Sequence, residues 1–218
     1  MRTVLTRFSM LPVFLGLFVL LPAGTFDFWQ FYAYLAVTVV PMVFVMIYFL
    51  REDPEFLVRR MRAREKEKQQ KNFQILSSVT FLSAYFIPGL DRRYGWSDIP
   101  LHTVLLADAI ILLGYLLVVL VFNQNRYASR IVEVEEDQKL ITTGLYSVVR
   151  HPMYLGVLLM FIPVPPALGS LWGLVPAVLF PIVLVIRILN EERVLKEGLP
   201  GYEEYCRKTR YRLIPFVW

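Results

Sequence analysis

The sequence predicts an all-α integral membrane protein, and three observations support that fold class. Apolar residues make up 56% of the 218-residue chain and charged residues only 19%, with a mean hydropathy of +0.52. Soluble domains usually carry about 25% charged residues. Several apolar runs approach or exceed the roughly 20 residues that a helix needs to cross a bilayer. The basic residues gather in the segments between these runs, as in the loops of membrane proteins.

The apolar runs define about six candidate membrane-spanning helices, at residues 5–22, 28–50, 73–90, 101–122, 152–163 and 167–189. A cleaved signal peptide is the alternative interpretation of the first run. The second run follows almost at once, which favours a helical hairpin instead. The fifth run has about twelve residues and is too short to cross a bilayer alone.

The last two runs predict a short helical hairpin over residues 152–189. The segment FIPVPPALG separates them, and its prolines (Pro163, Pro165 and Pro166) are expected to force the turn. Pro176 and Pro181 are expected to bend the second arm. The start of the first arm and the end of the second would then lie side by side.

Basic residues predict the orientation in the membrane. Residues 51–71 carry eight Lys and Arg, and more follow between the fourth and fifth runs and after residue 190, whereas the opposite loops hold only Arg92 and Arg93. The positive-inside rule therefore places both termini in the cytoplasm. The stretch 55–68 has two interpretations: an amphipathic helix that rests on anionic headgroups, or a solvent-exposed basic segment that only determines the topology. We expect one membrane domain over 1–218, comprising four N-terminal spans with a basic cytoplasmic loop at 51–72 (1–122) and a C-terminal catalytic region (123–218).

The composition also excludes some classes of function. Cys206 is the only cysteine, which excludes an internal disulfide, and with only His102 and His151 as histidines we expect no metal site. The net charge of +5 fits membrane topology, and no aromatic-interleaved basic surface indicates a nucleic-acid partner.

The stretch GLYSVVRHPMYLG (144–156) places a polar cluster where the fifth run begins. Pro152 suits the first turn of a helix, so this helix is expected to start at His151-Pro152 with backbone N–H groups that could receive an anion. Tyr154 shares a helical face with His151. The alternative is that Arg150 and His151 anchor the helix at lipid headgroups, with Tyr154 in the aromatic belt.

The stretch RILNEERVL (187–195) ends the sixth run. Arg187 lies just inside an apolar helix with Glu191 one turn later on the same face, and an ionisable residue within a span points to function. The alternative is that Arg187 reaches out to the interface and pairs with Glu191. A hairpin would bring these two residues to His151 and Tyr154, in a pocket at the membrane surface. Asp108, toward the outer half of the fourth run, is read as a structural hydrogen-bonding group.

The tail GLPGYEEYCRKTRYRLIPFVW follows, in which Gly198 and Gly201 break the helix. Tyr202, Tyr205 and the basic residues could cover the pocket from the cytoplasm or form a simple membrane-surface cap.

These motifs carry a family resemblance. KLITTGLYSVVRHPMYLG, RILNEERVL and GYEEYCRKTRYRLIP occur in this order and resemble the isoprenylcysteine carboxyl methyltransferase family, which is similar in motif to the membrane phospholipid N-methyltransferases. The resemblance covers residues 138–215. It implies a helical membrane enzyme that uses S-adenosylmethionine and releases S-adenosylhomocysteine.

The resemblance also implies roles for single residues. Arg187 would hold the substrate, and Arg187 and Glu191 would be the catalytic pair. The cofactor contacts would be Gln138, Lys139, Leu140, Ile141, Tyr146, His151, Pro152, Met153, Tyr154 and Glu191. Asn190 departs from relatives that carry more glutamates in a row, while Arg187 and Glu191 stay in register. No role carries over to Arg150, which we read as a headgroup anchor.

The favoured expectation is O-methylation of the carboxylate of an isoprenylcysteine-like or other lipophilic acid that enters from the bilayer, since an ionised carboxylate needs a cation but no base. One alternative is N-methylation of a phosphatidylethanolamine-type lipid, for which Glu191 or His151 would act as base. Further alternatives are an NADPH-dependent enzyme similar to sterol reductases and a non-enzymatic membrane protein.

Overall fold

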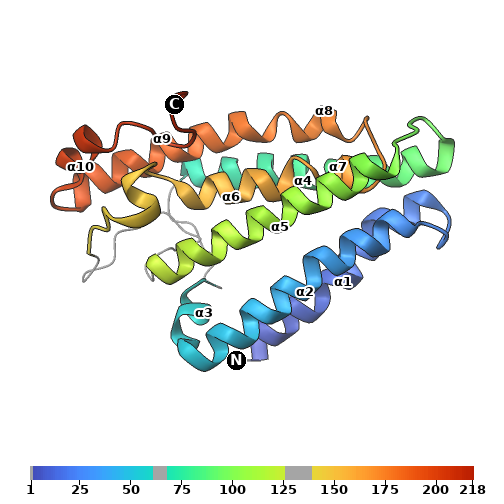
Figure 1. Cartoon of the computed structure of the whole chain (residues 1–218), viewed down its shortest axis with the longest axis horizontal. Coiled ribbons are helices and arrows are strands. Elements are labelled where there is room, and N and C mark those ends of the chain that lie inside the picture. Colours follow the sequence, from blue (N-terminus) through green and yellow to red (C-terminus); the bar gives the residue numbers. More distant parts are fainter. Residues whose placement is uncertain (1, 61–67, 126–138) are drawn as a thin grey trace.

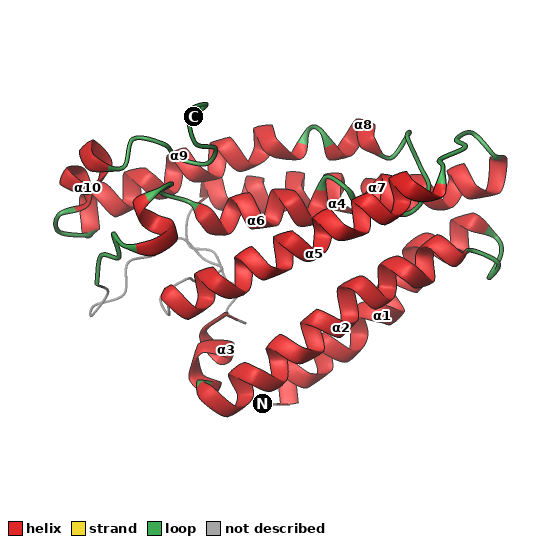
Figure 2. Ribbon diagram, viewed as in Figure 1, coloured by secondary structure: helices red, strands yellow, loops and turns green. Residues whose placement is uncertain are grey.

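The computed structural model describes residues 2–60, 68–125 and 139–218, and within these ranges it is helical with no strand (Figure 2). Its helices are α1 (Arg2–Ala23), α2 (Trp29–Glu52), α3 (Pro54–Arg60), α4 (Lys68–Tyr94), α5 (Leu101–Gln124), α6 (Pro152–Phe161), α7 (Val164–Ala167), α8 (Leu174–Ala177), α9 (Phe180–Gly198) and α10 (Tyr202–Lys208), and a 3-10 turn covers Gly144–Ser147. The all-α prediction is confirmed for this part of the chain.

Three helical segments are long and apolar enough to cross a membrane: Trp29–Glu52, Leu101–Gln124 and Leu174–Gly198. Two shorter apolar segments, Ser9–Ala23 and Pro152–Ala167, accompany them. Helix α5 exposes leucines along one broad face, which suits contact with lipid chains. The chain is thus a membrane protein. Each of the six expected runs contains helix, although the sixth begins with a turn over 168–173, and the count of six spans stays a prediction.

The long helices pack along one another as a bundle (Figure 1). Helix α1 packs on α4, α2 on α5, α5 on α6, and α4 on α8 and α9. Two close approaches depend on glycine, because a Cβ on Gly89 would lie 2.4 Å from the Val19 carbonyl oxygen and one on Gly114 would lie 2.8 Å from the Gly156 carbonyl oxygen. Small residues at such contacts let membrane helices approach closely.

The C-terminal hairpin differs from the expectation at its turn. Residues 164–167 continue as the short helix α7, because prolines are tolerated in the first turn of a helix, and the chain reverses only over 168–173. The predicted bend in the second arm is present as the break between α8 and α9, with Pro181 in the first turn of α9.

Helix α3 and the N-terminus lie toward the same end of the bundle as α10 (Figure 1). Phe56 and Leu57 of α3 are buried and pack with Phe49 of α2 and Phe122 of α5. The start of the 55–68 stretch is therefore anchored to the bundle by apolar contacts, and residues 61–67 of that stretch lie outside the described residues. This end of the molecule carries the candidate site.

Candidate active site

The start of α6 and the end of α9 meet through the side chain of Tyr154. Arg187 Nε donates a hydrogen bond to the Tyr154 hydroxyl at 2.8 Å, and that hydroxyl donates to Glu191 Oε2. Because one hydroxyl accepts from the cation and donates to the carboxylate, it fixes the distance between the two charged groups. The structure thus brings the three residues together, with the phenol of Tyr154 between Arg187 and Glu191.

Arg187 is only 6% exposed, although it lies in an apolar helix. Its side chain turns inward to Tyr154 and does not extend to the interface, so the alternative in which Arg187 simply reaches out to solvent is wrong. A buried guanidinium needs hydrogen-bond acceptors, and Tyr154 supplies one.

His151 is buried beside this group. Its Nδ1 lies 3.9 Å from Glu191 Oε1 and its Nε2 lies 3.3 Å from Glu192 Oε1. Its ring stacks on that of Tyr154 at a centroid distance of 5.7 Å. Because both rings are inside the protein, the alternative that they anchor α6 at lipid headgroups is wrong.

The backbone at the start of α6 is tied to the C-terminal tail. The N–H groups of Arg150 and His151 donate to the carbonyl oxygens of Tyr211 and Arg212, at 2.9 and 2.8 Å. These two N–H groups, which precede the first residue of α6, are therefore not available to an anion. Anion binding by the first turn of α6 itself stays a prediction. Pro152, which follows them, is buried and has no N–H to offer.

Arg150 is not a headgroup anchor, because it is 6% exposed and forms a buried ion pair. Its Nε donates to Glu192 Oε1 at 2.6 Å, while Nη1 donates to the carbonyl oxygens of Thr209 and Arg210 at 2.7 and 2.9 Å. Burial disfavours its charge, yet the hydrogen bond and charge of Glu192 outweigh that cost and raise the pKa of Arg150. The sequence analysis assigned no role to Glu192. The signal that could have found it is its position directly after Glu191 in the motif RILNEERVL.

The tail covers the region around Tyr146. The Tyr205 hydroxyl donates to the Tyr146 carbonyl oxygen at 2.7 Å, and Asn125 Nδ2 donates to the Tyr146 hydroxyl at 2.8 Å. Leu140 packs in the same cluster as Leu199 and Tyr205. Two segments expected to contact the cofactor are thus placed against α10.

The other predicted contacts are less closely grouped. Lys139 is exposed, and Ile141 and Met153 are half-buried. Gln138 lies outside the described residues. The structure therefore joins Tyr154, His151, Arg187 and Glu191 directly, and places Leu140 and Tyr146 beneath α10.

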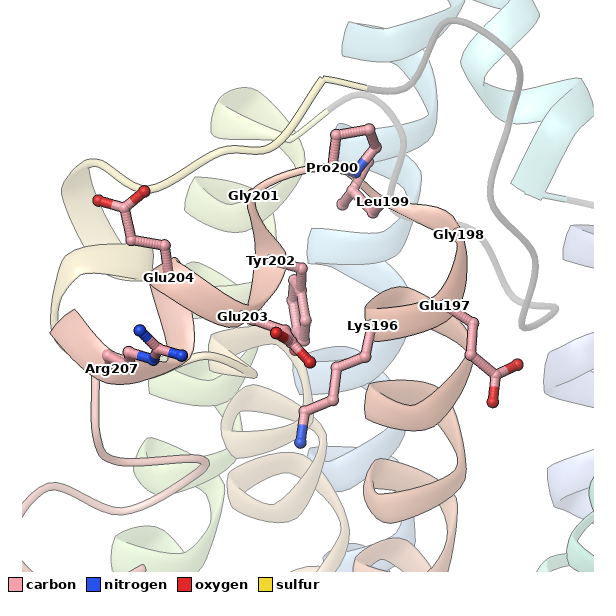
Figure 3. Close-up of a pocket in the computed structure, with 10 residues that line it drawn as sticks. All are labelled: Lys196, Glu197, Gly198, Leu199, Pro200, Gly201, Tyr202, Glu203, Glu204 and Arg207. Atoms are coloured by element: carbon pink, nitrogen blue, oxygen red, sulfur yellow. The ribbon is translucent and has the colours of Figure 1, made fainter.

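A pocket of about 560 Å³ lies between the end of α9 and α10 (Figure 3). Its lining includes Lys196, Glu203, Arg207 and Tyr202, and none of the residues predicted to contact the cofactor. The ring of Tyr202 points between the two helices, whereas Glu197 points away (Figure 3).

Tyr202 is a further candidate residue of the site. It is 3% exposed, and its hydroxyl has no hydrogen-bond partner among the described residues. Burial, with the nearby charge of Glu192, raises the pKa of Tyr202. The hydroxyl therefore keeps its proton at neutral pH and is available as a donor.

Asp108 lies apart from this site, in α5, and is 5% exposed. Neither of its carboxyl oxygens has a hydrogen-bond partner among the described residues, so its interpretation as a hydrogen-bonding structural group is wrong. Among the same residues, no group of three His, Cys, Asp or Glu lies close enough to hold a metal ion.

The comparison with known families agrees with the motifs. Residues 102–200 match the model of the phospholipid methyltransferase family. This part of the chain is therefore similar to the phospholipid methyltransferases. The match includes α5 to α9, and with them Tyr154, Arg187 and Glu191, so the resemblance stated from the motifs is confirmed for this region.

The curated proteins to which the chain is similar include the following two. The Delta(14)-sterol reductase of Mus musculus is 33% identical over 84 residues, which cover 37% of this chain and 20% of that protein. The cobalt-zinc-cadmium resistance protein CzcN of Cupriavidus metallidurans is 30% identical over 136 residues, which cover 60% of this chain and 57% of that protein. The chain thus spans a fifth and somewhat over half of these relatives, respectively.

Proposed function

We propose that this chain is a membrane methyltransferase that uses S-adenosylmethionine, and that its acceptor is the carboxylate of an isoprenylcysteine-like or other lipophilic acid. The observation that carries the proposal is the Arg187–Tyr154–Glu191 chain of hydrogen bonds, in which a buried cation and a carboxylate are held at a fixed spacing. These three residues lie within residues 102–200, which match the phospholipid methyltransferase family, and near the ends of apolar helices.

The residues present fit the cofactor. Glu191 keeps 24% of its side chain exposed, so its carboxylate can accept hydrogen bonds from an amino group or ribose hydroxyls. The buried Tyr202 hydroxyl has a proton to donate and no partner among the described residues. Leu140 and the ring of Tyr146 would offer apolar contact. Together with these, the proposed contacts are Gln138, Lys139, Ile141, His151, Pro152, Met153 and Tyr154.

When bound, the cofactor supplies a methyl group on a positively charged sulfur. An ionised carboxylate attacks such a methyl without losing a proton, so the protein's task is to position and hold charge. The positive charge of Arg187 attracts the acceptor carboxylate, and Tyr154 fixes the direction in which its guanidinium points. We propose that the lipid chain enters from the bilayer beside α6 and α9 while the cofactor enters from the cytoplasmic side.

A phospholipid amine is the alternative acceptor, and the name of the matched family favours it. The ammonium must then lose a proton, so Glu191 or His151 would act as base and Arg187 would hold the lipid phosphate. Both residues lie beside Tyr154, so the geometry of the site suits this chemistry as well.

A nicotinamide-dependent reductase is a second candidate function, because the mouse relative is a sterol reductase. Binding distinguishes it from a methyltransferase. We expect detergent-purified protein to bind labelled S-adenosylmethionine and not NADPH, and the opposite result would refute the proposal. A non-enzymatic protein would bind neither.

The acceptor is identified by the stability of the product. Membranes containing the protein are incubated with methyl-labelled S-adenosylmethionine, and the labelled lipid is treated with mild base. A carboxyl methyl ester releases labelled methanol, whereas an N-methylated lipid keeps its label. Release of the label supports the acid acceptor, and a base-stable label supports the phospholipid.

A further inference from the structure

Glu192 occupies a different position from its neighbour Glu191. Successive residues of a helix point about 100° apart, so Glu191 faces Tyr154 while Glu192 faces the tail. The Glu192 side chain is 4% exposed, against 24% for Glu191. Both oxygens of Glu192 are engaged: Oε1 with Arg150 at 2.6 Å and Oε2 with Arg212 at 2.9 Å. A carboxylate enclosed in this way has no face left for a ligand.

The partners of Glu192 connect it to a segment that crosses the start of α6. We call residues 209–213 the strap. Arg150 and His151 hold the strap by hydrogen bonds to four successive backbone carbonyls, those of Thr209, Arg210, Tyr211 and Arg212. Glu192 holds the same segment from the side through Arg212. The strap is thus bound at both its backbone and its side chains.

The same carboxylate also contacts His151. Glu192 Oε1 lies 3.3 Å from His151 Nε2, so the imidazole ring is held between Glu192 and Tyr154, on which it stacks. The backbone of His151 is held by the strap. One carboxylate therefore sets the ring orientation directly, and it sets the backbone position through the strap.

We infer that Glu192 is a positioning residue of the site, which orients His151 and seats the strap across the start of α6 without itself touching the cofactor. This inference rests on the proposed function, in which His151 contacts the cofactor. The charge balance supports it: one carboxylate lies between the guanidinium groups of Arg150 and Arg212. Without it, two like charges face each other and the strap loses its attachment.

The conservative variant Glu192→Gln removes the charge and keeps the shape. We expect it to bind S-adenosylhomocysteine roughly ten-fold more weakly by calorimetry, by analogy with the lower end of the loss seen when a residue that orients a metal-binding histidine is removed. Amide hydrogen exchange over residues 209–213 should become faster. Glu197→Gln, on the exposed side of α9, is the matched control and should leave both measurements unchanged.

The route through His151 is tested with a double variant. If Glu192 acts through the imidazole, the losses of affinity in His151→Ala and Glu192→Gln are not additive when the two changes are combined. Additive losses would overturn this route. Wild-type affinity in Glu192→Gln, even with a lowered unfolding temperature, would show a merely structural residue and overturn the inference.

Two further outcomes are distinguishable. If the wild-type protein binds no S-adenosylhomocysteine, the proposed function fails, and the exchange rates over 209–213 still decide whether Glu192 holds the strap. If Glu192→Gln does not fold, Arg212→Gln replaces it, because Arg212 is 29% exposed and its loss leaves the buried Arg150–Glu192 pair in place. Unchanged exchange over the strap in Arg212→Gln would then refute the seating role.

Discussion

Tyr154 determines how the charges of the site are held. Its hydroxyl lies between Arg187 and Glu191, which are one turn apart on α9. The interposed phenol keeps the two groups in register while both remain oriented toward the start of α6.

Arg187→Ala is expected to abolish methyl transfer while leaving cofactor affinity nearly intact. Removing a preorganised donor from a site typically costs a factor of about 10²–10³ in rate. The reason is that Arg187 is proposed to hold the acceptor. Turnover is measured with methyl-labelled cofactor, and affinity by calorimetry with S-adenosylhomocysteine.

The control for this experiment is Arg193→Ala, an exposed arginine on the same helix, which should keep wild-type turnover. Loss of cofactor binding in Arg187→Ala, with the lipid site preserved, would show that the two proposed roles are exchanged. Glu191→Ala is the complementary variant, and we expect it to weaken cofactor binding.

At the scale of the helices, the α5–α6 contact positions the start of α6. A Cβ on Gly114 would lie 2.7 Å from Met160 Cγ and 2.9 Å from the Met160 backbone nitrogen. The backbone atoms cannot move without shifting α6, so even a single methyl group is too large. Helix α6 carries Tyr154 in its first turn, and the packing of α5 therefore reaches the site.

Gly114→Ala is expected to destabilise the protein by about 1–3 kcal/mol, the usual cost of overpacking a filled contact. Gly16→Ala is the matched control, because Gly16 is also in a helix and no atom lies within 4 Å of its added Cβ. That change should be neutral or slightly stabilising, since alanine favours helix more than glycine does. Unfolding temperatures in detergent compare the two, and equal shifts would contradict the packing model.

Two buried aspartates, one on α4 and one on α5, differ in their hydrogen-bond partners. Asp91 at the end of α4 accepts hydrogen bonds from the Ser97 N–H and hydroxyl, both at 2.7 Å, and from the Ser170 hydroxyl at 2.5 Å. It ties the loop after α4 to the turn before α8. Asp108 in α5 has no such partner among the described residues.

We therefore expect opposite effects from the same substitution. Asp108→Leu should stabilise the protein by about 1–3 kcal/mol, because it removes an unsatisfied buried polar group. Asp91→Leu should destabilise it, since Ser97 and Ser170 lose their acceptor. Thermal unfolding in detergent measures both. A lowered unfolding temperature in Asp108→Leu would show that this carboxyl has a partner after all.

At the scale of the whole molecule, α3, which lies within the basic segment 51–71, and the site lie at one end of the bundle. The N-terminus, α3 and α10 are found toward this end, and the end of α4, whose last turn carries Arg92 and Arg93, is at the other (Figure 1). This arrangement suits the water-soluble cofactor and the membrane-embedded acceptor that we propose. The assignment of this end to the cytoplasm stays a prediction.

Cysteine labelling tests this topology. In a Cys206→Ser background, single cysteines replace Thr6, Asp98 and Lys208, all exposed. A membrane-impermeant maleimide applied to sealed, inside-out vesicles should label positions 6 and 208 and spare position 98. Labelling of 98 together with 208 would place the two ends of the bundle on the same side and refute the predicted orientation.

The sequence by itself determined the helices and the motifs of the site. Apolar runs longer than a helix needs leave the backbone no other way to satisfy its hydrogen bonds in lipid, so their boundaries could be read within a few residues. The pairs His151–Tyr154 and Arg187–Glu191 were recognisable because residues three or four positions apart share one face of a helix. The family match to residues 102–200 agrees with that interpretation.

Only the tertiary structure decided how these residues are paired. Arg150 and Glu192 lie 42 positions apart, and no local pattern indicates that they form a buried ion pair or that the strap occupies the N–H groups before Pro152. Likewise, the burial of Asp108 without a partner depends on which helices surround it. Local periodicity fixes the face of a helix on which a residue lies, but long-range packing chooses the group that it meets.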